Sequence, residues 1–168
     1  FSKKETAGLV NYVTDGVLSR EGIRRACSVL EKFRALLRYF DMETMYVFAT
    51  ASLRNIFNTQ EAVETIQRET GIDVDVLSGD MEAKLGYYGA LQTMELKDGA
   101  LFDIGGGSTE IVTVREGRIL QAQSLPIGSL NLFKDHVSKI WPKKKELNAM
   151  GETVKKTLSG AHLPQSKA

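Results

Sequence analysis

The sequence has few of the features that mark membrane, secreted or nucleic-acid-binding proteins. It contains one cysteine, Cys27, which excludes an internal disulfide framework and fits a reducing compartment. We find no run of about 18 apolar residues that could span a bilayer, and no basic-then-apolar leader. The formal net charge of +1 gives no reason to expect a nucleic-acid partner. We therefore expect a cytoplasmic protein with neither a nucleic-acid nor a membrane partner.

The composition and length fit a folded domain or two small lobes. Hydrophobic residues make up 42% and charged residues 26% of the 168 residues, the balance of a globular protein. The chain opens on Phe1 without an initiator methionine and closes in a polar tail, residues 163–168. We interpret both ends as signs that the sequence is part of something longer.

The first half of the chain alternates between helical and strand patterns. Ser19 is a candidate N-cap for a helix whose apolar residues recur at helical spacing through residue 40. A short apolar strand is expected over 45–49, a helix over 60–69 ended by Gly71, a strand over 74–77 and a helix over 81–94. Strands that alternate with helices predict an α/β fold with parallel strands.

The pattern changes after residues 97–99. Three strands with hairpin spacing are expected over 100–104, 110–114 and 119–125, followed by helices over 129–136 and 143–158. We place a boundary near residue 98. Residues 1–97 then form the remainder of a first lobe, and residues 98–168 the start of a second.

The most informative segment is FDIGGGSTEI, residues 102–111. Three consecutive glycines give up side-chain packing, which makes sense where the backbone approaches a ligand closely and directs N–H groups at an anion. We expect the amides of Gly105, Gly106, Gly107, Ser108 and Thr109 to bind phosphate. Asp103 and Glu110 supply the oxygen ligands that Mg²⁺ prefers, and Mn²⁺ uses similar ones. The alternative is a glycine-rich turn with incidental acids.

Two further segments follow the expected parallel strands, where ligands of open α/β sheets collect. Arg54 comes after the first strand, and its guanidinium could grip a phosphate, or it could cap a helix or pair with Glu61. Glu82 comes after the second strand and could act as a general base, although an acid in the first turn also suits the helix dipole. Together, the segments suit phosphoryl transfer, which needs alignment and charge neutralisation.

Other candidate residues favour structural roles. His136 and His162 lack partners at metal-site spacing, and Cys27 lies on the apolar stripe of its helix. The lysines at 143–145 and 155–156 are interpreted as solvated helix faces, with a weak polyanion contact as the alternative.

The segment FDIGGGSTEI, with ATASLR at 49–54 and SGDMEA at 78–83, resembles the exopolyphosphatase and guanosine pentaphosphate phosphohydrolase (Ppx/GppA) family. The resemblance runs from about residue 18 to residue 128. It implies a partial, two-lobed actin-like (ribonuclease H-like) ATPase fold. It also implies hydrolysis of terminal phosphates of inorganic polyphosphate or of pppGpp with magnesium, and allows a homodimer for the full-length protein.

The resemblance also implies a role for each candidate residue. Glu82 matches the catalytic base, Arg54 the arginine of the substrate groove, residues 105–109 the phosphate loop, and Asp103 and Glu110 the metal site. The sequence departs from the family at Leu130 and Asn131, where a valine and an arginine are usual, and it lacks the family's first phosphate loop before Ser19. Two alternatives stay open: an actin-like ATPase or kinase, and a non-catalytic module that senses polyphosphate.

Overall fold

The computed structural model describes residues 2–163, so Phe1 and residues 164–168 of the polar tail lie outside the described part. The chain divides into two compact units, Phe1–Leu77 and Ser78–Ala168. This division comes earlier than the boundary near residue 98 that we expected. The reason is that the helix after Ser78 packs against the strands that follow it in the chain.

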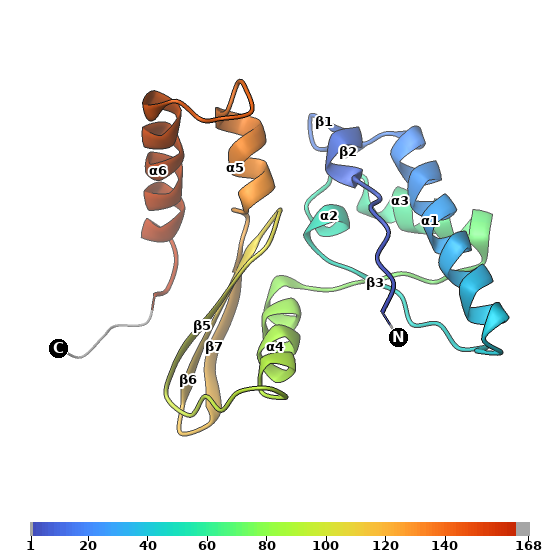
Figure 1. The fold of residues 1–168 in the computed structure, drawn as a ribbon, viewed down its shortest axis with the longest axis horizontal. Helices are drawn as coiled ribbons and strands as arrows, with labels where there is room; N and C mark the ends of the chain where they lie inside the picture. Colours follow the sequence, from blue (N-terminus) through green and yellow to red (C-terminus); the bar gives the residue numbers. More distant parts are fainter. Residues whose placement is uncertain (1, 164–168) are drawn as a thin grey trace. The chain divides into compact units, whose positions relative to one another are not determined.

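The first unit begins with a small hairpin that precedes a long helix (Figure 1). The 3-10 helix η1 (Leu9–Tyr12) comes first, and the hairpin consists of the antiparallel strands β1 (Val13–Thr14) and β2 (Val17–Leu18). The helix α1 (Arg20–Tyr39) starts at the expected cap, because the Ser19 hydroxyl oxygen accepts a hydrogen bond from the Gly22 amide at 3.2 Å. The hairpin was not predicted from the sequence.

The first unit contains one pair of parallel strands. The strands β3 (Phe48–Ala49) and β4 (Asp75–Val76) pair in parallel, as expected, but both are shorter than the apolar runs that predicted them. Between them come α2 (Ala51–Arg54) and α3 (Thr59–Thr70). Gly71 ends α3 with a φ of 68°, the left-handed conformation that glycine tolerates best.

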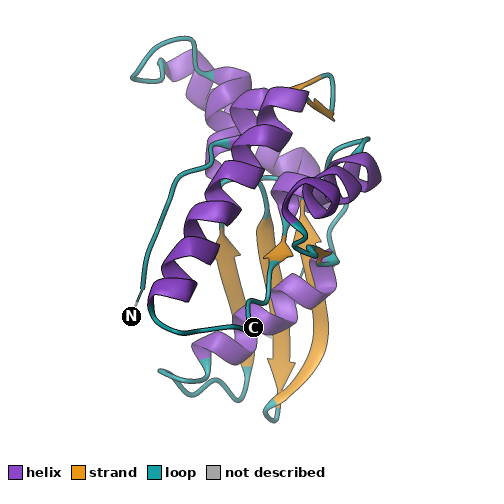
Figure 2. Ribbon diagram, turned by 90° about the vertical axis from the view of Figure 1, so that its right-hand side faces the viewer, coloured by secondary structure: helices purple, strands orange, loops and turns teal. Residues whose placement is uncertain are grey.

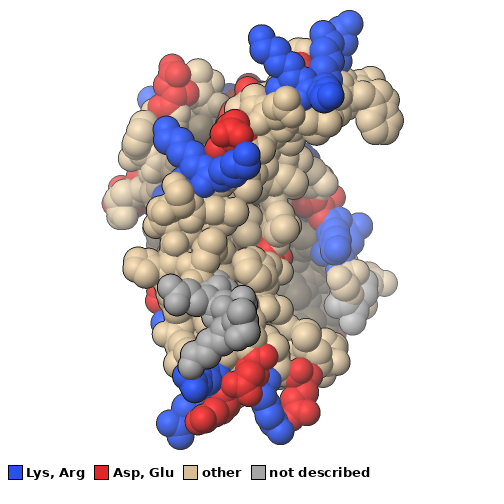
Figure 3. All heavy atoms as spheres, turned by 90° about the vertical axis from the view of Figure 1, so that its left-hand side faces the viewer, with Lys and Arg blue, Asp and Glu red and all other residues tan. Residues whose placement is uncertain are grey.

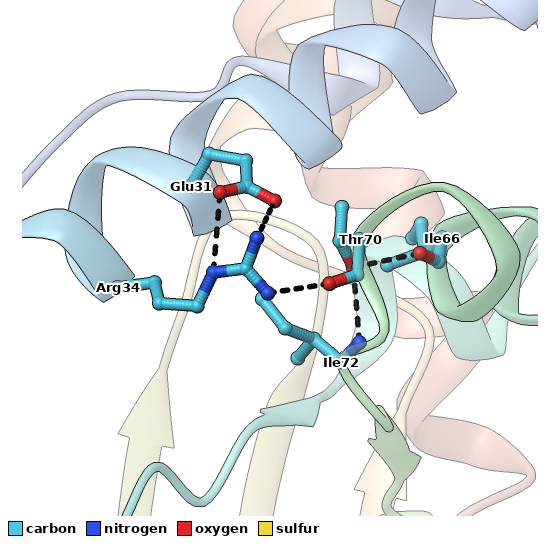
Figure 4. A network of polar contacts seen from close by, with 5 residues as sticks. All are labelled: Glu31, Arg34, Ile66, Thr70 and Ile72. Atoms are coloured by element: carbon cyan, nitrogen blue, oxygen red, sulfur yellow. Dashed lines mark hydrogen bonds and ion pairs between the residues drawn. The ribbon is translucent and has the colours of Figure 1, made fainter. Parts of the chain in front are cut away.

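The helices α1 and α3 pack together over an apolar core that includes Leu18, Ile23, Cys27, Leu53, Ala62 and Ile66. Figure 4 shows a polar network at the far end of this packing. Arg34 pairs with Glu31 on its own helix and donates to the Thr70 carbonyl oxygen. The Thr70 hydroxyl donates to the Ile66 carbonyl oxygen and accepts from the Ile72 amide. The bond from Arg34 therefore connects α1 to the end of α3.

The second unit begins with α4 (Gly79–Ala90) and continues as a meander. The strands β5 (Gly99–Ile104), β6 (Thr109–Arg115) and β7 (Arg118–Leu125) pair antiparallel in chain order, which confirms the predicted hairpin spacing. The helices α5 (Ser129–His136) and α6 (Lys144–Ser159) follow, close to their expected bounds.

The helices of the second unit cover opposite faces of its sheet. On one face, Ala83 and Tyr87 of α4 pack against Val112 and Val114 (Figures 1 and 2). On the other face, Ile111 and Leu125 pack with side chains of α5 and α6, namely Leu132, Val154 and Leu158. Each face therefore has its own core. No helix within residues 2–163 is long and apolar enough to cross a membrane.

Candidate functional site

The triglycine segment forms the tight turn between β5 and β6. The Gly105 amide donates to the Ser108 carbonyl oxygen at 2.9 Å and closes the turn. Ser108 is buried, and the three glycines are half-buried. We call residues 105–108 the glycine loop.

The start of α5 holds the carbonyl side of the glycine loop. The Gly105 carbonyl oxygen accepts from the Ser129 amide at 2.9 Å and from its hydroxyl at 3.1 Å. The Gly106 carbonyl oxygen accepts from the amides of Leu130 and Asn131 at 2.9 and 3.2 Å. The Gly107 carbonyl oxygen accepts from Asn131 Nδ2 at 3.1 Å. Three successive carbonyls therefore face one helix terminus.

The amide side of the glycine loop is turned away from α5. In a planar trans peptide the N–H points opposite to the C=O of the same peptide group. The amides of Gly106, Gly107 and Ser108 belong to the three peptides whose carbonyls face α5, so these N–H groups point away from α5. Within residues 2–163, no backbone acceptor is found for any of the three. Consecutive amides of this kind form an anion-binding concavity.

Close packing, rather than left-handed backbone, explains the glycines at positions 105 and 106. None of Gly105, Gly106 and Gly107, all among the described residues, has a positive φ. A β-carbon at Gly106 would lie 2.8 Å from Leu130 Cδ1, and one at Gly105 would lie 3.2 Å from the Ser108 carbonyl oxygen. We expected a ligand to approach this backbone closely. On the carbonyl side of the loop, the start of α5 makes that close approach.

The two acids beside the loop face each other across the β5–β6 pair. Asp103 and Glu110 are direct partners in the register, so both side chains lie on the sheet face that α4 covers. Glu110 is buried and accepts a hydrogen bond from the Ser124 hydroxyl at 2.7 Å. Asp103 is exposed, and its Oδ2 lies 3.8 Å from the place where a β-carbon on Gly86 would be.

Glu82 lies on α4 between two glycines that lie close to the sheet. A β-carbon on Gly79 would be 2.5 Å from Ser124 Cβ of β7, and one on Gly86 would be 3.8 Å from Asp103 Oδ2. Since residues three and four apart share a helix face, half-buried Glu82 lies beside the stripe that touches the sheet. Packing of α4 on the sheet thus brings Glu82 to the end of the sheet that carries Asp103 and Glu110.

The acids do not form a complete metal cage. Among the described residues, no three Asp, Glu, His or Cys side chains are grouped so that they could hold a metal ion. Mg²⁺ usually binds one or two carboxylates and takes its other ligands from waters and substrate phosphates. The pair of Asp103 and Glu110 fits that requirement, whereas it would not fit a structural zinc or calcium site.

Arg54 belongs to the first unit. It ends α2, directly after β3, and its Nη1 donates to the Leu77 carbonyl oxygen at 3.0 Å. Because Leu77 follows β4, this places the half-buried guanidinium at the carboxyl ends of the parallel strands, as expected.

Three residues that support the glycine loop or the acid beside it were not predicted as site residues from the sequence. They are Ser124, which binds Glu110, and Ser129 and Asn131, which bind loop carbonyls. Thr109, whose amide was expected to bind phosphate, donates its side-chain hydroxyl to the Ile127 carbonyl oxygen at 2.6 Å. The only sequence signal for these roles was the segment 124–128, whose Gly128 packs on the loop.

The residues assigned structural roles are engaged in the fold. His136 Nε2 lies 2.9 Å from the Thr153 hydroxyl. Cys27 is buried in the first core, which confirms its interpretation as a core residue. Burial, together with the nearby Glu69 carboxylate, raises the pKa of the Cys27 thiol to about 11. Asp80 accepts from Ser78 and pairs with Lys84, and these contacts lower the pKa of its carboxyl to about 2.

The chain is similar to known phosphatases. The model of the Ppx/GppA phosphatase family matches residues 1–166. The bifunctional 3-dehydroquinate synthase/phosphatase of Fusobacterium nucleatum is 33% identical over 120 residues, which is 68% of this chain and 18% of that protein.

Two solved structures resemble the chain closely. An exopolyphosphatase from Cytophaga hutchinsonii is 30% identical with a TM-score of 0.82, over 93% of this chain and 51% of that one. The Aquifex aeolicus member of the Ppx/GppA family is 28% identical with a TM-score of 0.69, over 94% of this chain and 52% of that one. The chain thus spans about half the length of these structures. The likeness confirms the predicted actin-like α/β fold.

Proposed function

The chain belongs to the Ppx/GppA phosphatase family, and on that premise we propose that the whole protein hydrolyses terminal phosphoanhydride bonds. The substrate class is inorganic polyphosphate or guanosine pentaphosphate (pppGpp), and the product is inorganic phosphate. One observation carries the proposal for this chain. The glycine loop has its carbonyls bound by α5, while the amides of Gly106, Gly107 and Ser108 have no backbone acceptor among the described residues.

In this proposal the glycine loop binds the oxygens of a substrate phosphate through these amides. Preorganised N–H groups stabilise charge that develops on phosphoryl oxygens without any reorganisation during the reaction. Asp103 and Glu110 would hold Mg²⁺, which when bound offsets the negative charge of the phosphates. Ser124 keeps the Glu110 carboxylate oriented through its hydrogen bond.

Glu82 is the proposed general base. The water oxygen bonds to the terminal phosphorus, the water proton passes to the Glu82 carboxylate, and the bridging P–O bond breaks to release phosphate and the shortened chain. The role of Arg54 is to bind substrate phosphate with its guanidinium fork.

A phosphate-release assay on the full-length protein tests the proposal. Glu82→Gln removes the base but keeps the shape of the side chain, so turnover of polyphosphate should fall by about 10²–10⁴-fold while substrate binding persists. Unchanged turnover would remove Glu82 from the mechanism. Tight ATP binding without phosphate release from polyphosphate would instead identify an actin-like ATPase or kinase, and polyphosphate binding without release would identify a sensing module.

A further inference from the structure

The loop between α5 and α6 displays two large apolar side chains at its tip. Ile140 and Trp141 are 80% and 82% exposed, and they are neighbours in the chain. We call residues 137–143 the tip loop. An adjacent pair of large side chains, both almost fully exposed, is costly in water unless it contacts something else.

The structure holds the tip loop in shape through one carboxylate. Glu146 Oε1 accepts from the Ser138 amide at 3.2 Å and from its hydroxyl at 2.7 Å. Glu146 Oε2 accepts from the Lys143 amide at 2.7 Å. Both ends of the loop are thus bound to one side chain in the first turn of α6. Ile140 and Trp141 are therefore exposed on a loop whose two ends are fixed.

Basic residues flank this apolar tip in the sequence. Lys139, Lys143, Lys144 and Lys145 are all exposed, and none has an ion pair within residues 2–163. Glu146 is occupied by the loop itself, which leaves exposed Asp135 on α5 as the nearby acid in the sequence. Figure 3 shows basic side chains gathered at the top of this face, the end at which Figure 1 places the start of α6.

We propose that the tip loop docks on the surface of an anionic lipid bilayer. Trp141 and Ile140 would lie at the boundary between headgroups and acyl chains, and the lysines would contact anionic headgroups. An apolar insertion and a basic cluster are the two signals that together give stable peripheral binding. The sequence-based expectation of no membrane partner rested on the lack of a spanning segment, and a surface contact requires none.

Charge and apolarity together favour a bilayer over the proposed substrate as the occupant. A polyphosphate chain could bind the lysines, but it offers no apolar surface to Ile140 or Trp141. An anionic bilayer matches both parts of the tip loop. This inference is independent of the catalytic proposal, because it uses none of the residues assigned to phosphate binding or catalysis.

Intrinsic fluorescence tests the inference without a label, because Trp141 is the only tryptophan in the chain. The full chain is titrated with phosphatidylcholine vesicles that contain phosphatidylserine, and with vesicles of phosphatidylcholine alone. We expect a blue shift of the emission and co-sedimentation with the anionic vesicles only, both reversed by high salt. No shift, or an equal shift with neutral vesicles, would overturn the inference. So would a shift produced by soluble polyphosphate, or by raising the protein concentration without lipid.

Variants distinguish binding through the tip loop from non-specific attraction between any lysine and the anionic vesicle. Replacing Lys144 and Lys145 by glutamine should lower the vesicle partition coefficient on the order of 20-fold, since each basic residue near an anionic surface contributes to binding. The same exchange at Lys155 and Lys156, at the other end of α6, is the matched control and should have little effect. Ile140→Ser keeps Trp141 as the reporter and should reduce the blue shift. Equal losses from both lysine pairs would contradict a specific docking loop.

Discussion

Gly128 lies against Gly106 so closely that a β-carbon on Gly128 would be 2.4 Å from the carbonyl carbon and oxygen of Gly106. It would also lie 2.6 Å from the Gly107 nitrogen. Backbone thus meets backbone where the segment before α5 crosses the glycine loop. This contact sets the position of the carbonyl groups that α5 binds, and through them the direction of the amides.

Gly128→Ala should therefore damage the glycine loop. The added methyl group would meet backbone atoms of Gly106 and Gly107, which cannot move aside as a side chain can. We therefore expect a loss of about 1–3 kcal/mol in the free energy of unfolding and weaker phosphate binding. Chemical denaturation and phosphate titration measure the two effects. Gly151→Ala on α6, where no atom lies within 4 Å, is the control and should not destabilise the protein. A Gly128→Ala protein as stable as the parent would contradict the packing described here.

The glycines of α4 should respond differently to the same substitution. Gly79→Ala places a methyl group 2.5 Å from Ser124 Cβ and should push the helix off the sheet, lowering the free energy of unfolding by about 1–3 kcal/mol. Gly89→Ala meets no atom within 4 Å and should raise it by about 0.5–1 kcal/mol, because alanine favours the helix. Thermal or urea unfolding of both variants tests the pair. Equal effects would mean that α4 does not approach β7 at Gly79.

Asn131 should matter for ligand binding more than for stability. Its side-chain amide is bonded to the Gly107 carbonyl oxygen, so Asn131→Ala frees that peptide to rotate and should weaken phosphate binding. The loss of one partly buried hydrogen bond should cost only about 1 kcal/mol of stability. Asn148→Ala on exposed α6 is the matched control. Phosphate affinity that is the same in both variants would show that the loop does not need Asn131.

The Cys27 thiol should react slowly and should make stability fall at alkaline pH. Its pKa is raised from 9.0 to about 11 in the folded protein. The unfolded chain therefore loses this proton first, so the contribution of Cys27 is intact below pH 9 and is lost as the pH rises toward 11. Iodoacetamide labelling at pH 8 should be at least about a hundredfold slower in the native protein than in urea. Cys27→Ala should show a smaller fall in stability over the same pH range, and an identical fall would assign it to other groups.

Local patterns in the sequence predicted most elements of the fold. The Ser19 cap, the Gly71 terminus and the hairpin spacing after residue 98 are signals carried by neighbouring residues, and each matches the structure. The division of the chain was not predictable in this way. It depends on α4 packing against strands that lie later in the chain, a non-local contact that no local pattern encodes.

The residue types of the site could be predicted from the sequence, but the hydrogen bonds that hold those residues in place could not. Carboxylates and glycines at residues 103–110 indicated phosphate and metal chemistry from the sequence alone. The roles of Ser124 and Asn131 come from hydrogen bonds between segments far apart in the chain, so spacing could not reveal them. The sequence analysis explained the glycines by the approach of a ligand. In the structure, close packing against residues 128–130 is enough to explain Gly106.

The direction of the loop amides is best tested by their own NMR signals. Inorganic tripolyphosphate is titrated into the ¹⁵N-labelled chain, and the backbone amide shifts are followed residue by residue. We predict saturable shifts at Gly106, Gly107 and Ser108, with a much smaller change at Gly105, whose amide is already bonded to Ser108. Shifts confined to the exposed lysines, with the three loop amides unchanged at saturating ligand, would contradict the proposed phosphate site.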